Sequence, residues 1–330
     1  MRRIFTASLL IFVLGLTGFL PVRAFSASLW SPAELAATPE ERKAGRLTAP
    51  DLTPPDRTAP LAALAPLPPE RRGSIRRVDT GGEKLVALTF DLCELSDQRA
   101  GYDGAIVDYL RAEGVPATFF ASGKWLRSHP ERSMQLLADP LFEVGSHAWT
   151  HGNFGVLSPE RMREQIAWTQ AQYELTREAM VQLAAKRGLP ELAAASPASI
   201  RVFRFPYGRC RAEALELLAG MGIAAVQWDV NMMDAAKTRT AQTVARDVER
   251  GVKPGSIVLG HANGFGYATA DALRLIVPAL RAKGYRFVTV SALLDAGRAV
   301  TAAQCYDSRP GDTDVYDVLF GDGTVHRRNK

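Results

Sequence analysis

Short apolar runs alternate with helix-like stretches between residues 82 and 295 of the chain. Near-continuous apolar strands that alternate with helices are typical of a parallel sheet covered by helices. The strand-like runs are 84–90, 116–122, 142–148, 199–205, 224–230, 256–262 and 286–290. The pattern therefore predicts seven β/α units.

The helical stretches include residues 104–114, 159–188 and 270–284. Seven β/α units can form an open doubly wound sheet or a closed barrel. No Gly-rich phosphate loop follows the first strand-like run, which disfavours a nucleotide-binding open sheet.

Polar residues that could take part in catalysis or metal binding lie at the ends of successive strand-like runs. A barrel of parallel strands builds its active site at the carboxyl ends of those strands. We therefore expect an α/β barrel of (β/α)7 type, with its site at that end. The residues concerned are Asp91, His147, His151, Arg204, Asp229 and His261.

The N-terminal part of the chain has a different texture. Residues 1–24 have a basic start, an apolar stretch and a Val-x-Ala ending, as in a cleaved signal peptide. The alternative is a membrane anchor, but the apolar stretch is at the lower limit for a span. We therefore expect an exported, periplasmic or secreted protein with no stable membrane span after cleavage.

The remaining boundaries follow from composition. Residues 25–80 are rich in Pro and Ala and predict a linker or surface arm, residues 81–300 form the barrel, and residues 301–330 form a C-terminal tail. With 330 residues, of which 47% are hydrophobic, the chain can bury one large core. Lys and Arg exceed Asp and Glu by only 40 to 35, without aromatic interleaving, so no nucleic-acid partner is expected.

Three motifs carry candidate chemistry. In "SHAWTH" (146–151), His147 and His151 are four apart and can reach one divalent ion if the segment makes a helical turn. In "RFPYG" (204–208), the residues around Pro206 force a turn that can present backbone N–H groups to an oxyanion. In "LGH" (259–261), His261 can act as an acid or a base.

The order of five motifs resembles the polysaccharide deacetylase family, also called carbohydrate esterase family 4 or the NodB homology domain. The motifs are "TFD" (89–91), "SHAWTH" (146–151), "RFPYG" (204–208), "WDVNMMD" (228–234) and "LGH" (259–261). The resemblance implies a distorted barrel that removes N-acetyl groups from amino sugars of a polysaccharide or oligosaccharide. It also implies a divalent metal, which we expect to be zinc, with cobalt or nickel as alternatives.

The resemblance carries roles over to individual residues. It implies that Asp91 is the catalytic base and that Arg204 orients it. It implies that His261 is the general acid. His147 and His151 match two metal ligands.

Two parts of the family pattern differ here. The family's third ligand is an aspartate, but this chain has Leu92 there, which cannot coordinate a metal. The candidates to replace it are Cys93, Glu94, Asp103 and Asp91 itself.

The resemblance assigns the turn at Tyr207, with Pro206, to binding the substrate oxyanion. In the fourth motif it places Asn231 and Ala235 where the family has an aspartate that tunes the catalytic histidine and a tryptophan. The role of the nearby Asp229 and Asp234 stays open.

The three cysteines, Cys93, Cys210 and Cys305, allow one internal pair at most. Cys93 and Cys210 fall on loops at the same end of the expected barrel, so we predict a bridge between them. The alternatives are that Cys93 is a thiolate metal ligand, or that both thiols are unpaired and buried. Two other functions also stay open, a non-catalytic carbohydrate-binding protein and a hydrolase of a small amide.

Overall fold

A computed structural model describes residues 29–192 and 196–326 of the protein, and the predicted residues 1–24 lie outside these ranges. Seven of the described strands close into a ring, in which the last strand pairs again with the first. In ring order they are β3 (Leu85–Leu92), β5 (Ala117–Ala121), β6 (Phe142–Ser146), β7 (Val202–Phe203), β8 (Ala224–Val226), β2 (Ser74–Asp79) and β10 (Ser256–His261). The predicted α/β barrel is confirmed.

The ring is mostly parallel but not regular. Its neighbours are parallel except for β2 and β10, which share one antiparallel bridge between Arg77 and Ser256. The strands outside the ring are β1 (Gly45–Arg46), β4 (Gln98–Arg99), β9 (Val230–Asn231), β11 (Arg286–Phe287) and β12 (Arg298–Ala302).

One strand of the ring differs from the prediction. The expected strand 286–290 is only β11, which pairs with the first two residues of β3. The seventh place belongs to β2, which lies within residues 25–80, the segment predicted as a linker or surface arm. The sequence of β2, "SIRRVD", breaks the apolar pattern with Arg76 and Arg77, although Arg76 is buried.

Burial on both faces explains why the ring strands are almost continuously apolar. Every residue of β3 is buried. Leu85 and Ala87 face the barrel interior with Leu259, whereas Leu88 and Leu92 face the helix layer. Successive side chains of a strand point to opposite faces, so this alternation also fixes which later residues point inward.

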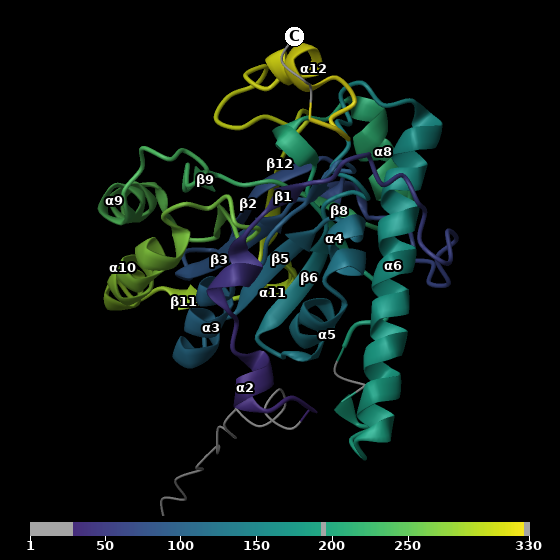
Figure 1. Ribbon diagram of the computed structural model, residues 1–330. Coiled ribbons are helices and arrows are strands. Elements are labelled where there is room, and N and C mark those ends of the chain that lie inside the picture. Colours follow the sequence, from purple (N-terminus) through teal and green to yellow (C-terminus); the bar gives the residue numbers. More distant parts are fainter. Residues whose placement is uncertain (1–28, 193–195, 327–330) are drawn as a thin grey trace, which may run out of the picture.

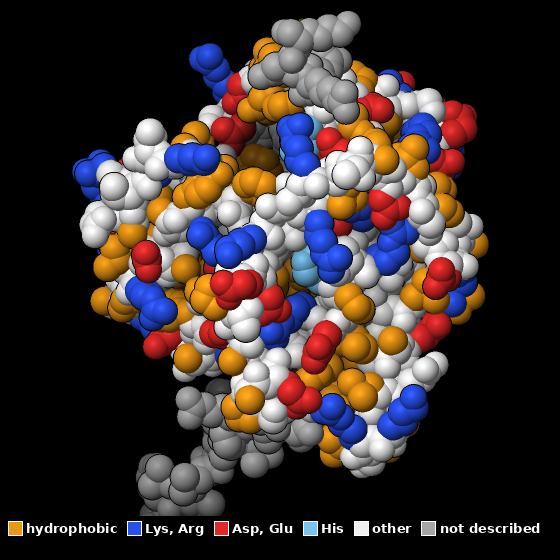
Figure 2. Space-filling view, in the orientation of Figure 1, with side chains coloured by type: hydrophobic (Ala, Val, Ile, Leu, Met, Phe, Trp, Pro, Cys, Tyr) orange, Lys and Arg blue, Asp and Glu red, His pale blue; other side chains and the backbone are white. Residues whose placement is uncertain are grey.

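Helices surround the ring. The longest, α6 (Pro159–Lys186), runs along one side of the barrel, with α9 (Ala241–Gly251) and α10 (Thr269–Ala282) on the opposite side (Figure 1). The other helices are α2 (Pro32–Leu35), α3 (Gly104–Glu113), α4 (Gly123–Ser128), α5 (Pro130–Ala138), α8 (Ala212–Gly220), α11 (Val290–Asp295) and α12 (Val315–Phe320). On the face drawn in Figure 2, acidic and basic side chains are interspersed.

The predicted arm is anchored to the barrel at several points. Trp30 is buried in the main core, and Arg132 of α5 pairs with Glu41 at 2.8 Å. Arg42 pairs with the buried Asp103 at 2.7 Å. The described part of the arm is therefore bound to the barrel surface by both apolar and charged contacts.

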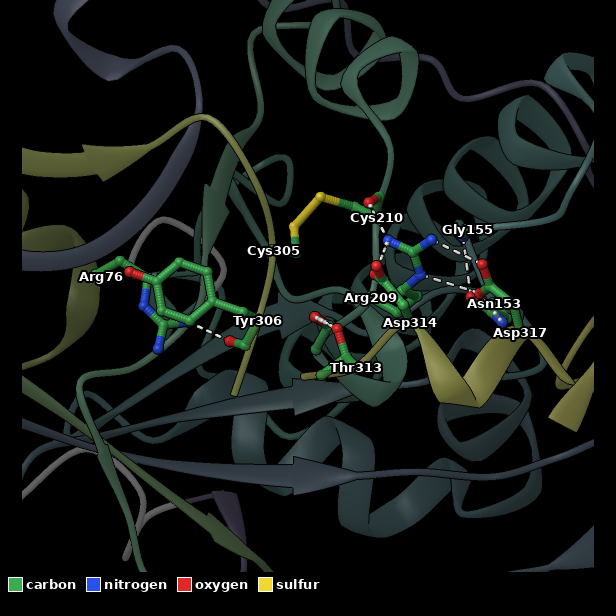
Figure 3. The surroundings of a disulfide bond; sticks show 11 residues. Arg76, Asn153, Gly155, Arg209, Cys210, Cys305, Tyr306, Thr313, Asp314 and Asp317 are labelled. Carbon is green, nitrogen blue, oxygen red and sulfur yellow. Dashed lines mark hydrogen bonds and ion pairs between the residues drawn. A yellow bond between two sulfur atoms is a disulfide. The ribbon is translucent and has the colours of Figure 1, made fainter. Parts of the chain in front are cut away.

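The C-terminal segment, residues 303–326, contains α12 and folds back over the carboxyl ends of the strands (Figure 1). A disulfide joins Cys305 to Cys210, with their Cα atoms 5.3 Å apart (Figure 3). Arg209 pairs with Asp317 at 2.7 Å and with Asp314 at 3.0 Å. These contacts hold the predicted tail in a fixed position.

The predicted bridge between Cys93 and Cys210 is wrong, since Cys210 is joined to Cys305 and Cys93 is free. Cys210 packs in an apolar cluster with Phe154 and Phe205. Cys93 lines the cavity inside the ring of strand ends. The two thiols thus belong to different surroundings, although their loops lie at the same end of the barrel.

Among the described residues, no helix is both long enough and apolar enough to cross a membrane.

We predict that Cys305→Ala lowers the free energy of unfolding by about 2–4 kcal/mol, because the bridge restricts the unfolded chain. Urea unfolding of the oxidised protein and the variant measures this difference. Cys93→Ser is the matched control, because it removes a thiol and leaves the bridge intact. An equal loss on reduction of wild type and of Cys305→Ala would contradict the prediction.

Candidate active site

A cavity of about 600 Å³ lies at the carboxyl ends of the ring strands. Asp91, His147, His151, Tyr207 and His261 all line it, as predicted from their positions after strands. The predicted substrate residue Pro206 is buried in its turn and is not among the lining residues. Its contribution is therefore the shape of the turn.

A buried ion pair forms the floor of the site. Arg204 is fully buried, and its Nη1 donates to Oδ1 of Asp91 at 2.9 Å. The same guanidinium donates to the carbonyl oxygens of Val226 and Gln227 at 3.3 and 3.1 Å. Asp91 therefore has one oxygen fixed by Arg204, while Oδ2 lies 3.6 Å from Nε2 of His147.

The two histidines lie side by side in the loop after β6. Their ring centroids are 4.8 Å apart, but His151 has a φ of 60° and Ala148 a φ of 66°. The segment is thus a loop with left-handed residues and not the helical turn that the spacing suggested. The loop brings both rings to the cavity without helical periodicity.

The two imidazoles are available as neutral donors. Burial lowers the pKa of His147, and it lowers the pKa of His151 well below its ordinary value. Nδ1 of His147 is 2.9 Å from the Arg204 carbonyl oxygen, to which it donates, so that Nε2 is left with a lone pair. Nδ1 of His151 is buried without a hydrogen-bond partner among the described residues.

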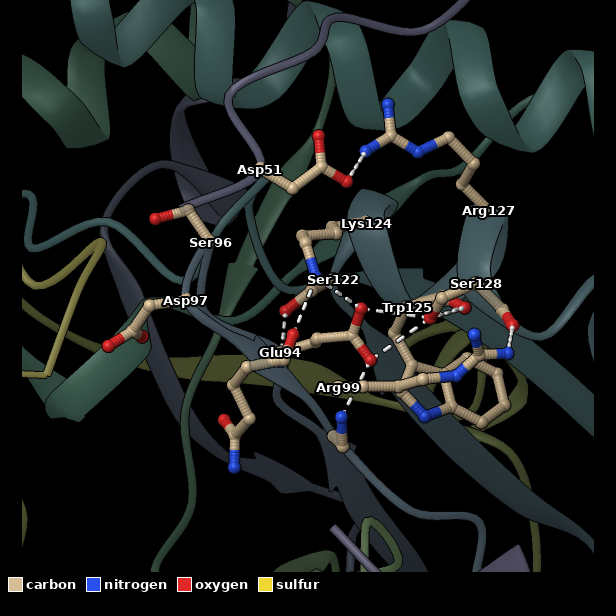
Figure 4. Close-up of polar contacts among 12 residues, drawn as sticks. Asp51, Glu94, Ser96, Asp97, Arg99, Ser122, Lys124, Trp125, Arg127 and Ser128 are labelled. Carbon is tan, nitrogen blue, oxygen red and sulfur yellow. Dashed lines mark hydrogen bonds and ion pairs between the residues drawn. The ribbon is translucent and has the colours of Figure 1, made fainter. Parts of the chain in front are cut away.

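The structure reduces the candidates for a third ligand. Glu94 is buried and accepts hydrogen bonds from Lys124 at 2.8 Å and from Ser128 at 2.8 Å (Figure 4). Asp103 is held by Arg42. Cys93 and Asp91 remain. The Cys93 sulfur and one ring nitrogen from each of His147 and His151 all lie within 4.8 Å of one another. Oδ2 of Asp91 lies 3.6 Å from Nε2 of His147.

These residues fit a divalent metal on chemical grounds. Two neutral imidazoles with an adjacent sulfur or carboxylate are a donor set that zinc, cobalt and nickel accept. The unpartnered buried nitrogen of His151 is also explained if the cavity holds a cation.

Comparison with known proteins identifies the family. The polysaccharide deacetylase family profile matches residues 79–226. A chitooligosaccharide deacetylase of Rhizobium leguminosarum bv. phaseoli is 30% identical over 216 residues, which cover 62% of this chain and 84% of the relative. A peptidoglycan-N-acetylglucosamine deacetylase of Bacillus cereus is 29% identical over 215 residues, which cover 64% of this chain and 69% of the relative.

The chain belongs to the polysaccharide deacetylase family. The predicted family and enzyme class, a hydrolase of this family, are confirmed.

Solved structures of the family share the barrel. A family 4 pseudoenzyme from Bacillus anthracis matches with a TM-score of 0.55 and 25% identity, covering 69% of this chain and 71% of that chain. A family 4 acetyl xylan esterase from Clostridium thermocellum, in complex with a cobalt ion, has a TM-score of 0.50 and 27% identity. The match covers 64% of this chain and 91% of the esterase.

In this deacetylase-family barrel, Asp234 and not Asn231 contacts the second catalytic candidate. Oδ1 of Asp234 is 2.8 Å from Nδ1 of His261, and its Oδ2 accepts from the His261 backbone N–H and the Thr269 hydroxyl. The motif alignment placed the aspartate three residues too early. Met233, with a φ of 54°, bends the chain just before Asp234.

The two neighbouring polar residues have other roles. Asn231 donates to Asp307 of the C-terminal segment at 2.8 Å. Asp229 accepts from the hydroxyl of Ser256 and the backbone N–H of Ile257, both at 2.9 Å. Asn231 therefore fastens the C-terminal segment, and Asp229 fastens the start of β10. Ala235 lines the cavity but offers no aromatic surface where the family has tryptophan.

The Asp234 carboxylate governs the charge of His261. Burial by itself lowers the pKa of His261, but the charge and hydrogen bond of Asp234 outweigh burial and raise it. Burial raises the pKa of Asp234, but its contacts with His261 and Thr269 outweigh burial. The pKa of Asp234 is therefore lowered overall. The pair therefore favours a protonated imidazole beside an ionised carboxylate.

One wall of the cavity comes from residues that the sequence did not suggest. Asp307, Tyr316, Phe320 and His326 of the C-terminal segment line the cavity. The ring of Tyr207 stacks on Phe320 with centroids 4.7 Å apart. The sequence contained one indication that this segment returns to the barrel, namely Cys305, which had no predicted partner and is bridged to Cys210.

We predict that Asp234→Asn lowers the pKa of His261, because the negative charge that raises it is lost. NMR titration of the imidazole measures the shift in the metal-free protein. Asp229→Asn is the matched control, since it makes the same change in a partly buried carboxylate that does not contact His261. A similar His261 pKa in all three proteins would contradict the role of Asp234.

Proposed function

We propose that the protein hydrolyses the N-acetyl amide of amino sugars in a polysaccharide, with the help of a divalent metal. One observation carries the proposal. A carboxylate fixed by arginine and a histidine fixed by aspartate face the same cavity, and both lie beside two neutral imidazoles. Amide hydrolysis requires a base for water and an acid for the leaving amine, and the cavity offers one group for each task.

Asp91 is the base in this proposal. Arg204 binds Oδ1 and keeps the carboxylate in one orientation, so that Oδ2 can accept the proton of a water molecule. Because the pair is buried, no solvent competes for this orientation.

His261 is the acid. Its Nδ1 donates to Asp234, so the proton that it delivers is on Nε2. Asp234 raises the pKa of His261, which favours the protonated imidazole that can deliver its proton to the leaving amine. The backbone N–H in the Tyr207 turn is the proposed donor to the oxyanion, and the φ of 61° at Tyr207 fixes the turn.

His147 and His151 hold the metal in this proposal. A bound divalent ion polarises the acetyl carbonyl and lowers the pKa of a bound water. We propose zinc, with cobalt or nickel as alternatives, because imidazole suits these ions. The cobalt-containing esterase of the same fold supports a divalent ion.

The proposed substrate is an N-acetylglucosamine polysaccharide, such as peptidoglycan or a chitin oligomer. The names of the relatives support this class. So do the aromatic residues Trp228, Tyr316 and Phe320 in the cavity wall, because aromatic faces pack well against apolar surfaces.

We also propose that the protein is exported. The N-terminal sequence supports this, and the Cys210–Cys305 disulfide is of a kind that persists in oxidising compartments. N-terminal sequencing of protein from the periplasm or medium should start near Phe25. An intact Met1 on membrane-bound protein would contradict it.

We predict that Asp91→Asn reduces acetate release from peptidoglycan and chitin oligomers by at least about 100-fold, because asparagine cannot accept the proton. Asp229→Asn is the control and should retain most activity. Circular dichroism is needed alongside, since the change also leaves the buried Arg204 charge without its partner, at a cost of roughly 3–5 kcal/mol.

A non-catalytic carbohydrate-binding protein is the second candidate. Leu92 at a family ligand position and the similar pseudoenzyme from Bacillus anthracis favour it. Calorimetry with chitin oligomers and acetate assays with zinc, cobalt or nickel separate the two. Binding without acetate release for any of these metals would overturn the deacetylase proposal.

A further inference from the structure

Cys93 lies on the cavity side of the chain just past the end of β3. It is two residues beyond Asp91, and residues two apart in an extended strand share a face. Leu92, between them, packs in the main core with Ala121. Leu92, at the position of the family's metal-ligating aspartate, therefore points away from the cavity, and Cys93 points into it.

The sulfur of Cys93 is close to the two histidines. Its Sγ and one ring nitrogen of His147 and of His151 lie within 4.8 Å of one another. Two donors on one zinc ion are at most about 4.4 Å apart, the sum of a Zn–S and a Zn–N bond. In a tetrahedral site the sulfur and nitrogen donors are about 3.6 Å apart, so side-chain movements of up to about 1 Å let the three donors share an ion.

The competing donors are engaged. Glu94 is bound by Lys124 and Ser128, and Asp103 is bound by Arg42. Asp91 could coordinate a metal only through Oδ2, since Arg204 holds its Oδ1. Cys93 forms a cluster with both histidines. Its thiol is not part of a disulfide.

A second observation points to a ligand at this place. His151 is 7% exposed, yet its Nδ1 has no hydrogen-bond partner among the described residues. Buried polar atoms in native proteins are normally paired, so this ring sits where a cation or another ligand completes its contacts.

We propose that Cys93 is the third protein ligand of the divalent ion, as a thiolate that replaces the family's carboxylate. The proposal rests on the metal site of the proposed function. On binding, the S–H bond breaks, the S–metal bond forms and the proton goes to solvent. A thiolate carries the same single negative charge as the carboxylate, so the net charge of the ligand set is preserved.

The replacement has a consequence for metal choice. Thiolate is a softer donor than carboxylate, so the site should favour zinc and cobalt over manganese and magnesium. Without metal the thiol keeps its proton, because burial raises the pKa of Cys93 well above its ordinary value. A coordinating cation removes that proton.

The experiment is cobalt titration of the full-length, metal-stripped protein, followed by absorption spectroscopy. We expect a sulfur-to-cobalt charge-transfer band in the near ultraviolet together with the visible d–d bands. Cys93→Ser should lose the charge-transfer band and weaken cobalt binding by more than about 100-fold, the upper end of the cost of losing an outer-shell partner. Cys93→Asp should bind cobalt without the band.

Two further variants identify the source of the signal. The double variant Cys210→Ala/Cys305→Ala removes both bridged sulfurs and should keep the band. His147→Ala should lose tight cobalt binding altogether. If the double variant lost the band while it still bound cobalt, the assignment to Cys93 would be overturned.

The outcomes separate this inference from the function on which it rests. Wild-type protein that binds no cobalt, zinc or nickel would overturn the metal-assisted function and the ligand together. Cobalt bound through His147 without a charge-transfer band, and with unchanged affinity in Cys93→Ser, would overturn only the thiolate ligand. Asp91 Oδ2 would then be the third donor.

Discussion

The buried Asp91–Arg204 ion pair is the contact on which the site depends. Arg204 follows β7, and through its guanidinium it binds the carboxylate of β3 and two carbonyl oxygens near β8. Its own carbonyl accepts the hydrogen bond from His147. The guanidinium also lies over the ring of Phe120, 4.1 Å from its centroid. One residue, through its side chain and its carbonyl, therefore fixes the carboxylate, one imidazole and the barrel interior relative to one another.

Much of the fold could be predicted, because strands buried on two faces leave a continuous apolar signal. β2 gave no such signal. Its Arg76 is buried, but the side chain donates to backbone carbonyls of residues 306 and 307 and lies 4.0 Å from the ring centroid of Tyr306. The guanidinium is accommodated in the interior by carbonyl groups that are 230 residues away in the chain. The sequence alone shows only a charged residue, for which an exposed position is the usual prediction.

Part of the site could also be predicted, because several of its residues are placed by apolar strands that the sequence shows clearly. Asp91 and His261 lie at the carboxyl ends of β3 and β10, and His147 follows β6 directly, so the parallel ring places them together. Asp234 could not be placed, because it acts from a loop whose path depends on the left-handed backbone at Met233. The cysteine pairing also could not be deduced, since three thiols allow several pairs and only the packing around Cys210 selects one.

The C-terminal wall has a consequence for how the molecule is made. Residues 303–326 are synthesised after the whole barrel, and they contribute one side of the cavity. A nascent chain with every barrel strand in place therefore still has an open site. The cavity takes its final shape only after this segment has docked and the disulfide of Cys305 has formed. A complete substrate-binding surface therefore exists only after synthesis of the barrel and oxidation of the cysteines.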